Sequence, residues 1–289
     1  MTYDLLIGQR AYSSWSLRGW LPFDAFGIPV RVHRTRIYGP DFAAEVAAFA
    51  GGRTVPAAKA PDGGRLTDSL AIAWHLADSF PDRGLLPAPG PARAMAQNLI
   101  SEMHTGFGAL RQACPMNLLT AWTGFDPSPQ VQADLARIEA IWHSALDQSG
   151  GPFLFGSYTL ADVVFAPVAA RIAGYCLKVN DAARSYVATQ IAHPSMRRWR
   201  AMALAENRVL DVYDPPLARA PYPAPAALPA RAVPDGPSIN AACPYSGKPV
   251  TDYLELEGRI WGFCNPFCRD KTVADPAAWP KFMAMSTAG

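Results

Sequence analysis

Residues 3–21 read YDLLIGQRAYSSWSLRGWL, in which a short apolar run ends at a glycine and a serine-rich segment opens an amphipathic stretch. The apolar run predicts a strand, and the serines predict the start of a helix, since serine is a favoured helix cap. Gly27 then breaks this helix, and residues 28–35 alternate as a second strand does. The start of the chain therefore predicts a strand–helix–strand unit.

A second unit follows directly along the chain. Residues 55–59 and 63–67 predict a short hairpin, and residues 70–77 have apolar side chains at helical spacing behind an Asp68-Ser69 cap. Together the two units predict an α/β domain over residues 1–82.

The rest of the chain predicts three further regions. Residues 91–212 contain long amphipathic stretches and no convincing strand, which predicts an all-helical domain. Residues 213–237 contain eight prolines interleaved with alanine, so we expect a semi-rigid extended linker that forms neither helix nor sheet ladder. Residues 238–289 then form a small module that holds three of the five cysteines.

Composition excludes several classes of protein. Half of the residues are hydrophobic and 17% are charged, as in a globular protein, and the net charge of +2 without a long basic run argues against a nucleic-acid partner. No signal peptide and no membrane-spanning stretch is expected. Cys114 and Cys176 stand alone, which does not fit a secreted disulfide framework, so we expect a cytoplasmic protein.

Two serines are the first candidates for chemistry. Ser13 and Ser14 lie between the first strand and the first helix, where free backbone N–H groups and the helix dipole favour negative charge. A hydroxyl at this place could stabilise a thiolate. It could equally be a plain helix cap, which is the common use of such a serine.

Two further segments could each bind a ligand or have only a structural role. A cis peptide at Val55-Pro56 would turn the Val55 backbone outward to pair with an extended ligand, whereas an ordinary trans proline would simply begin a strand. At a helix start, Asp68 and Ser69 could hold the ammonium and carboxylate of an amino-acid head group, or could only cap the helix.

In their order and spacing these signals resemble the glutathione S-transferase superfamily, in a bacterial branch whose first helix opens with a Tyr-Ser-Ser-Trp-Ser-Leu-Arg motif like that of residues 12–18. The resemblance covers residues 3–212 and implies a thioredoxin-like glutathione-binding domain followed by an all-helical domain. It implies a cis-proline at Pro56, beside Val55. It also implies that Asp68 and Ser69 grip the γ-glutamyl end of glutathione, although Asp68 is shorter than the family's usual Glu or Gln.

The resemblance also implies a role for the first helix. A hydroxyl matching Ser14 would donate a hydrogen bond to the glutathione sulfur, with Ser13 as the alternative, and Trp15 would lie in the same binding site. Such a bond favours the thiolate and lowers the pKa of the thiol. The implied activity is transfer of glutathione to a small hydrophobic electrophile, or isomerisation, with a peroxidase side activity also open.

The second substrate is expected between the two domains, near Trp15. The candidate lining residues lie on the first long helix and the loop after it, at Met103, His104, Phe107, Arg111, Trp122 and Phe125. Such a stripe is more often core than pocket. The resemblance implies a homodimer. The alternative to an enzyme is a non-catalytic glutathione-fold binding or assembly protein whose cysteine tail senses metal or redox state.

Thr159 and Asp162 resemble the family's buried capping box before a long core helix. Thr159 can accept from the N–H of Asp162, while the Asp162 carboxylate reaches back to the N–H of Thr159. We assign this pair to folding rather than to catalysis.

The three C-terminal cysteines form the last candidate site, a cluster that could bind a metal. Cys243 precedes a glycine turn, and Cys264 and Cys268 follow a strand-like hairpin at a predicted helix start. This arrangement resembles small treble-clef-like metal-binding modules, in which residues 275–279 would match the closing helix, and implies zinc as a cofactor. Zinc normally takes four ligands. Asp270, a water or a ligand from another domain could complete the shell, or the module could keep its fold without metal; a disulfide is a further alternative.

Overall fold

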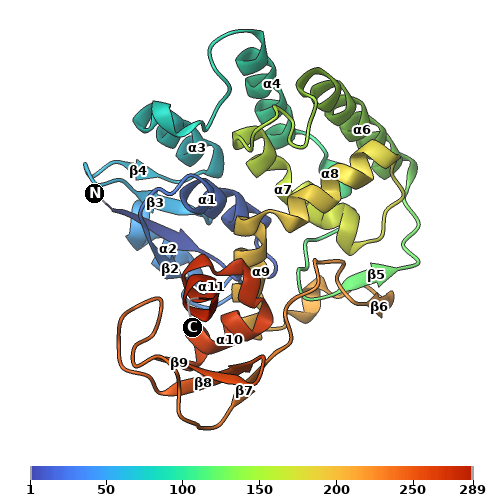
Figure 1. Cartoon of the computed structure of the whole chain (residues 1–289). Coiled ribbons are helices and arrows are strands. Elements are labelled where there is room, and N and C mark those ends of the chain that lie inside the picture. Colours follow the sequence, from blue (N-terminus) through green and yellow to red (C-terminus); the bar gives the residue numbers. More distant parts are fainter. Residues whose placement is uncertain (1, 288–289) are drawn as a thin grey trace. The chain divides into compact units, whose positions relative to one another are not determined.

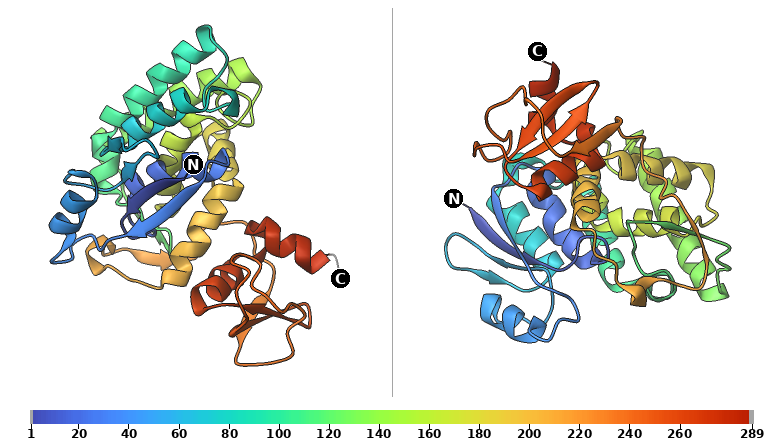
Figure 2. Two further views of the ribbon diagram at one scale, coloured as in Figure 1. Left: turned by 90° about the vertical axis from the view of Figure 1, so that its left-hand side faces the viewer. Right: turned by 90° about the horizontal axis from the view of Figure 1, so that it is seen from below.

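The computed structural model describes residues 2–287 and divides into two compact units. The first unit consists of Met1–Ile191 and Leu210–Pro223, and the second of Ala192–Val209 and Ala224–Gly289. No helix among the described residues is long and apolar enough to cross a membrane. Figure 1 gives the element labels, and Figure 2 shows the chain from two further sides.

The first unit opens with a four-stranded sheet of order β2-β1-β3-β4. Strand β1 pairs in parallel with β2 and antiparallel with β3, which in turn pairs antiparallel with β4. These elements are β1 (Tyr3–Ile7), α1 (Ser14–Ala25), β2 (Val30–Arg34), α2 (Phe42–Ala50), β3 (Ala57–Lys59), β4 (Arg65–Leu66), α3 (Ser69–Ser79) and η1 (Pro81–Arg83). The predicted thioredoxin-like arrangement is confirmed.

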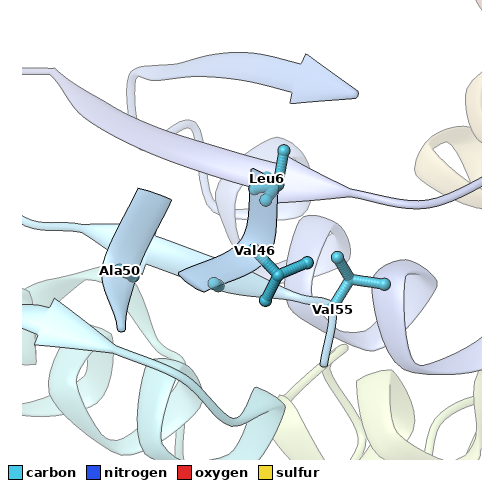
Figure 3. Close-up of a cluster of buried hydrophobic side chains, with 5 residues drawn as sticks. Leu6, Val46, Ala50 and Val55 are labelled. Atoms are coloured by element: carbon cyan, nitrogen blue, oxygen red, sulfur yellow. The ribbon is translucent and has the colours of Figure 1, made fainter. Parts of the chain in front are cut away.

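Helix α2 was not predicted from the sequence. Its residues Val46 and Ala50 pack against Leu6, Val55 and Ala57 of the sheet and of the segment before β3. Figure 3 shows the Val46 and Val55 side chains beside each other in this cluster. Side chains alternate across a strand, so the neighbours of Leu6 in β1 face the other side of the sheet.

Gly19 brings α1 close to the loop before β3. A Cβ atom placed at Gly19 would lie 2.6 Å from the Cβ and Cγ atoms of Pro56, so any larger residue would force the two segments apart. The Val55–Pro56 peptide bond is cis, as the resemblance implied. The start of α1 and the backbone of Val55 are therefore held near each other.

Helices make up most of the remainder of the first unit, as predicted. They are α4 (Pro91–Thr105), α5 (Gly108–Ala113), α6 (Pro129–Ser149), α7 (Leu160–Gly174) and α8 (Asp181–Ala192), with the short η2 (Asp211–Tyr213). Helix α7 is buried along its whole length, and its capping box between Thr159 and Asp162 is confirmed. The Asp162 carboxylate accepts from the Thr159 N–H at 2.9 Å.

Two expectations about strands were wrong. The helical region contains β5 (Ala121–Thr123), which pairs antiparallel with β6 (Ala218–Ala220). The proline-rich segment therefore does contribute to a sheet ladder, because its prolines fall outside the paired residues 218–220. The same segment also contributes β7 (Ala230–Val233), whose residues contain no proline.

The second unit contains a three-stranded antiparallel sheet of order β7-β8-β9. Its other elements are β8 (Asp252–Leu256), β9 (Arg259–Phe263), α9 (Pro194–Glu206), α10 (Pro266–Ala274), η3 (Pro276–Ala278) and α11 (Pro280–Thr287). The predicted hairpin and the helix after Cys264 are present, whereas the expected closing helix at 275–279 is the single 3₁₀ turn η3. Figure 2 shows this sheet beside α10.

Helix α9 is part of the core of the second unit. Arg197 forms two hydrogen bonds with the Asp275 carboxylate at 2.7 and 2.8 Å, and Arg198 donates to the carbonyl of Ala278 at 3.2 Å. Trp199 is fully buried. These contacts tie α9 to the segment that follows α10.

Candidate functional site

Ser13 and Ser14 have different surroundings at the start of α1. Ser13 is the helix cap: its Oγ accepts from the N–H of Ser16 at 3.2 Å and donates to the Ser16 Oγ at 2.7 Å. The Ser16 Oγ in turn accepts from the N–H of Gly8 at 3.0 Å. The Ser13 hydroxyl hydrogen is therefore used in a hydrogen bond within the protein and is not free to bind a ligand.

Ser14 is the first residue of α1, and its hydroxyl is available for a ligand. Its Oγ accepts a hydrogen bond from Nη2 of Arg171 at 3.2 Å. Because Arg171 can only donate, the Ser14 hydroxyl keeps its own hydrogen for another acceptor. Both serines line a cavity of about 360 Å³, together with Trp15, Val55 and other residues of the first unit.

A second cavity, of about 290 Å³, adjoins the first. It is lined by Trp15, Thr54, Val55, Pro56, Thr67, Asp68 and Ser69, and it shares Trp15, Thr54 and Val55 with the cavity at Ser14. The structure thus brings together every residue that the sequence suggested for glutathione binding.

Asp68 caps α3. Its Oδ1 accepts from the N–H of Leu70 at 2.7 Å and from the N–H of Ala71 at 3.3 Å, while its Oδ2 lies 3.8 Å from Nε2 of His104. Since Oδ1 is engaged by α3, Oδ2 is the oxygen left for an ammonium group. Capping and ligand binding are compatible at this residue.

The Trp15 ring is surrounded by two arginine guanidinium groups and one histidine ring. The guanidinium carbon of Arg18 is 3.7 Å from the Trp15 ring centroid and that of Arg111 is 5.0 Å away, while His104 makes an edge contact at 5.5 Å. Burial lowers the pKa of Arg18 to about 9. Burial also lowers the pKa of His104, although Asp68 opposes that shift.

Half of the six residues expected to line the second-substrate pocket are core residues instead. Met103, Phe107 and Trp122 are buried, with Met103 Sδ accepting from Arg18 at 3.1 Å, and Phe125 packs edge-on against Tyr175. Of the expected set, only Arg111 lines the cavity at Ser14.

Several residues of this cavity were not predicted from the sequence, namely Tyr12, Ile37, Phe42, Pro115, Met116, Arg171 and Tyr213. Arg171 could have been singled out from the sequence, because it is a charged residue in a mostly apolar helix. Its contact with Ser14, 157 residues away, depends on tertiary packing and has no local signature.

The three tail cysteines also gather in one place, within the second unit. The sulfur atoms of Cys243, Cys264 and Cys268 all lie within 4.8 Å of one another, and those of Cys264 and Cys268 are 4.0 Å apart. The Ser246 hydroxyl donates to the sulfur of Cys264 at 3.1 Å. Asp270 instead accepts from Arg269 at 2.7 Å and is not part of this group.

Cys243 has the most polar surroundings of the three. Burial opposes its ionisation, but backbone N–H donors of Tyr245, Cys264 and Ser246 and the Ser246 hydroxyl outweigh burial and lower the pKa of Cys243 to about 7. Sulfur accepting several N–H bonds at a turn is an environment suited to a thiolate. Three sulfurs so placed suit zinc, for which bonds of about 2.3 Å put sulfurs about 3.8 Å apart in a tetrahedral shell.

Comparison with known proteins agrees with this architecture. Residues 12–79 match the family model described as the glutathione S-transferase N-terminal domain. No curated protein matches the chain. The fold of the chain is that of solved glutathione transferases.

Three solved structures illustrate the similarity. A glutathione transferase homologue from a Burkholderia strain, BGR1, with bound glutathione is 20% identical, with a TM-score of 0.54 over 70% of this chain and 98% of its own. Glutathione transferase Omega 2S from Trametes versicolor, in complex with 2,4-dihydroxybenzophenone, is 21% identical, with a TM-score of 0.52 over 68% and 93%. A glutathione S-transferase from Rhodospirillum rubrum F11 is 18% identical, with a TM-score of 0.50 over 74% and 94%.

Proposed function

We propose that this chain is a glutathione-dependent transferase that activates the glutathione thiol for attack on a small electrophile. The observation that carries the proposal is the meeting of two cavities at Trp15 and Val55, one containing the Ser14 hydroxyl and the other containing Asp68 and Ser69. Glutathione is long enough to place its γ-glutamyl end in one and its sulfur in the other. Conjugation and isomerisation both begin from this thiolate.

Each protein group has a defined task in this scheme. The backbone of Val55 pairs with the extended peptide, while Asp68 Oδ2 and Ser69 hold the ammonium and carboxylate of the γ-glutamyl group. The Ser14 hydroxyl donates to the sulfur, and the N-terminus of α1 adds its positive dipole. Arg171 orients the Ser14 Oγ by donating to it. Together these donors lower the pKa of the thiol.

The first test is the steady-state turnover of glutathione with a panel of electrophiles by wild type and by Ser14→Ala. We expect kcat/KM to fall about 10- to 1,000-fold, as when a single anion-stabilising donor is deleted, and the pH profile of kcat/KM to move to higher pH. Ser101→Ala, an exposed serine on α4, is the matched control. Absence of both turnover and glutathione binding in wild type would leave a non-catalytic binding protein as the better description.

We also propose that the thiolates of Cys243, Cys264 and Cys268 hold a zinc ion with a structural role. The fit of the three sulfurs supports this, and a water could complete the shell as the fourth ligand. We expect about one zinc per chain in protein purified without chelator, measured by elemental analysis, and loss of that zinc in Cys264→Ser. Cys176→Ser, at an exposed cysteine elsewhere, should keep the metal. Metal-free wild type that takes up no added zinc would refute the proposal.

A further inference from the structure

The cavity at Ser14 has an unbalanced positive charge. Its lining residues include the guanidinium groups of Arg111 and Arg171 and no carboxylate. Arg171 is 6% exposed and donates to three neutral oxygens: the Cys114 carbonyl at 2.9 Å, the Pro167 carbonyl at 3.2 Å and the Ser14 Oγ at 3.2 Å. A buried charge without a counter-ion is costly, so the cavity favours an anion.

Arg111 is the group best placed to bind that anion. Its Nη2 donates to the carbonyls of Met103 at 3.3 Å and Gly106 at 2.9 Å, which fixes the guanidinium beside the Trp15 ring. Among the described residues, none accepts a hydrogen bond from Nε or Nη1 of Arg111. Burial lowers the pKa of Arg111 and the nearby Asp134 carboxylate opposes that shift, although this carboxylate accepts from the N–H of Leu110 at 2.9 Å and not from Arg111.

Glutathione by itself leaves Arg111 without an anionic hydrogen-bond acceptor. In the proposed binding mode the γ-glutamyl group lies near Asp68 and Ser69, and the thiolate lies at Ser14, next to Arg171 rather than at the free Nε and Nη1 hydrogens of Arg111. The cavity lining also includes Tyr12, Tyr213 and Met116. The cavity therefore combines a surface for an unsaturated ring with a cation.

We propose that the second substrate is a small aromatic or unsaturated carboxylic acid, whose carboxylate binds Arg111 while its electrophilic carbon faces the sulfur at Ser14. This inference rests on the proposed function and specifies its substrate class. Both hydrogens of Arg111 Nη2 are engaged by carbonyls, so the carboxylate would bind through the Nη1 or Nε hydrogens. Such a charge-assisted bond is stronger than a bond to the oxygen of a neutral amide of the same shape. The preference should therefore be for the acid over its neutral amide.

The test compares 4-chloro-3-nitrobenzoate with 4-chloro-3-nitrobenzamide. In each reaction the sulfur–carbon bond forms and the carbon–chlorine bond breaks, chloride leaves with the bonding electron pair, and the thiol proton passes to solvent. We expect wild type to prefer the acid about 10- to 100-fold in kcat/KM, after division by the uncatalysed rates. Arg111→Met should reduce this ratio by about the same factor, and Arg111→Lys by less.

Arg65→Met is the matched control, because Arg65 is an exposed arginine on β4 and its loss changes the net charge equally. It should leave the acid-to-amide ratio at the wild-type value. A wild-type ratio near or below one, or a ratio that Arg111→Met does not change, would overturn the inference while leaving the transferase proposal standing.

Calorimetric binding of the same two compounds, without glutathione, separates the two proposals. If wild type turns over no electrophile of the panel and binds no glutathione, but the acid still binds about 10-fold or more tightly than the amide in an Arg111-dependent way, the transferase proposal fails and the anion site stands. If the acid binds no better than the amide, the anion site fails whatever the turnover. Circular dichroism of Arg111→Met and Arg111→Lys checks that both variants are folded.

Discussion

At the scale of single residues, Asp162 shows how a buried charge can be accommodated. Burial raises its pKa, while N–H donors from Leu154 and Thr159 and the hydroxyls of Tyr186 and Thr159 oppose that rise. Its Oδ1 accepts from Leu154 at 3.1 Å and from Tyr186 at 2.8 Å. The carboxylate therefore joins the start of α7 to the preceding loop and to α8.

Asp162→Ala should be strongly destabilising, because it leaves these buried donors without an acceptor. We expect the free energy of unfolding to fall by about 3–5 kcal/mol, measured by chemical denaturation. Asp181→Ala is the comparison, since Asp181 is exposed and pairs with Arg184 within one helix turn. Its loss should be within about 0.5 kcal/mol of wild type. Equal losses in the two variants would show that Asp162 has no special structural role.

Neighbouring residues at the site differ in how far the sequence could predict them. Position alone could not separate Ser13 from Ser14, because the choice depends on which hydroxyl is used by Ser16 and which faces Arg171. The conformation of Val55–Pro56 and the capping box at Asp162 followed from the resemblance and are confirmed. The roles of Ser14, Asp68 and Ser69 toward glutathione stay predictions.

At the scale of secondary-structure elements, local signals predicted most of the fold. Strand β1 is the expected short apolar strand, α1 has a serine cap as expected, and β3 and β4 form the expected hairpin. Helix α2 was missed although Asp41 precedes it and Gly51, at φ 79°, ends it in a left-handed conformation. Both are ordinary helix-boundary signals, so this helix was predictable.

The β5–β6 pair was not predictable in the same way. Its two strands are three residues each and nearly a hundred residues apart, with Trp122 opposite Arg219. Such short strands acquire their identity from pairing and not from propensity. The same reason explains Arg171, whose burial beside Ser14 becomes apparent only when α7 is packed in the first unit.

At the scale of the whole molecule, the chain consists of two compact units whose boundary does not follow the order of the sequence. Residues 192–209, which include α9, group with the tail, and residues 210–223 return to the first unit. The second unit is small, and small units often depend on a metal for stability. The proposed zinc ion would therefore stabilise α9 together with the tail.

Removal of zinc should thus loosen the second unit selectively. In hydrogen exchange followed by mass spectrometry, we expect a zinc chelator to accelerate exchange of amides in β8, β9, α10 and α9 by about 10-fold or more, because metal-binding free energy is part of the folding free energy of such a unit. Amides of α7, buried in the first unit, serve as the internal control and should exchange at the same rate. Cys264→Ser should reproduce the chelator's pattern without added chelator. Faster exchange spread equally over α7 and α10, or no change in either, would contradict a structural zinc that supports the second unit.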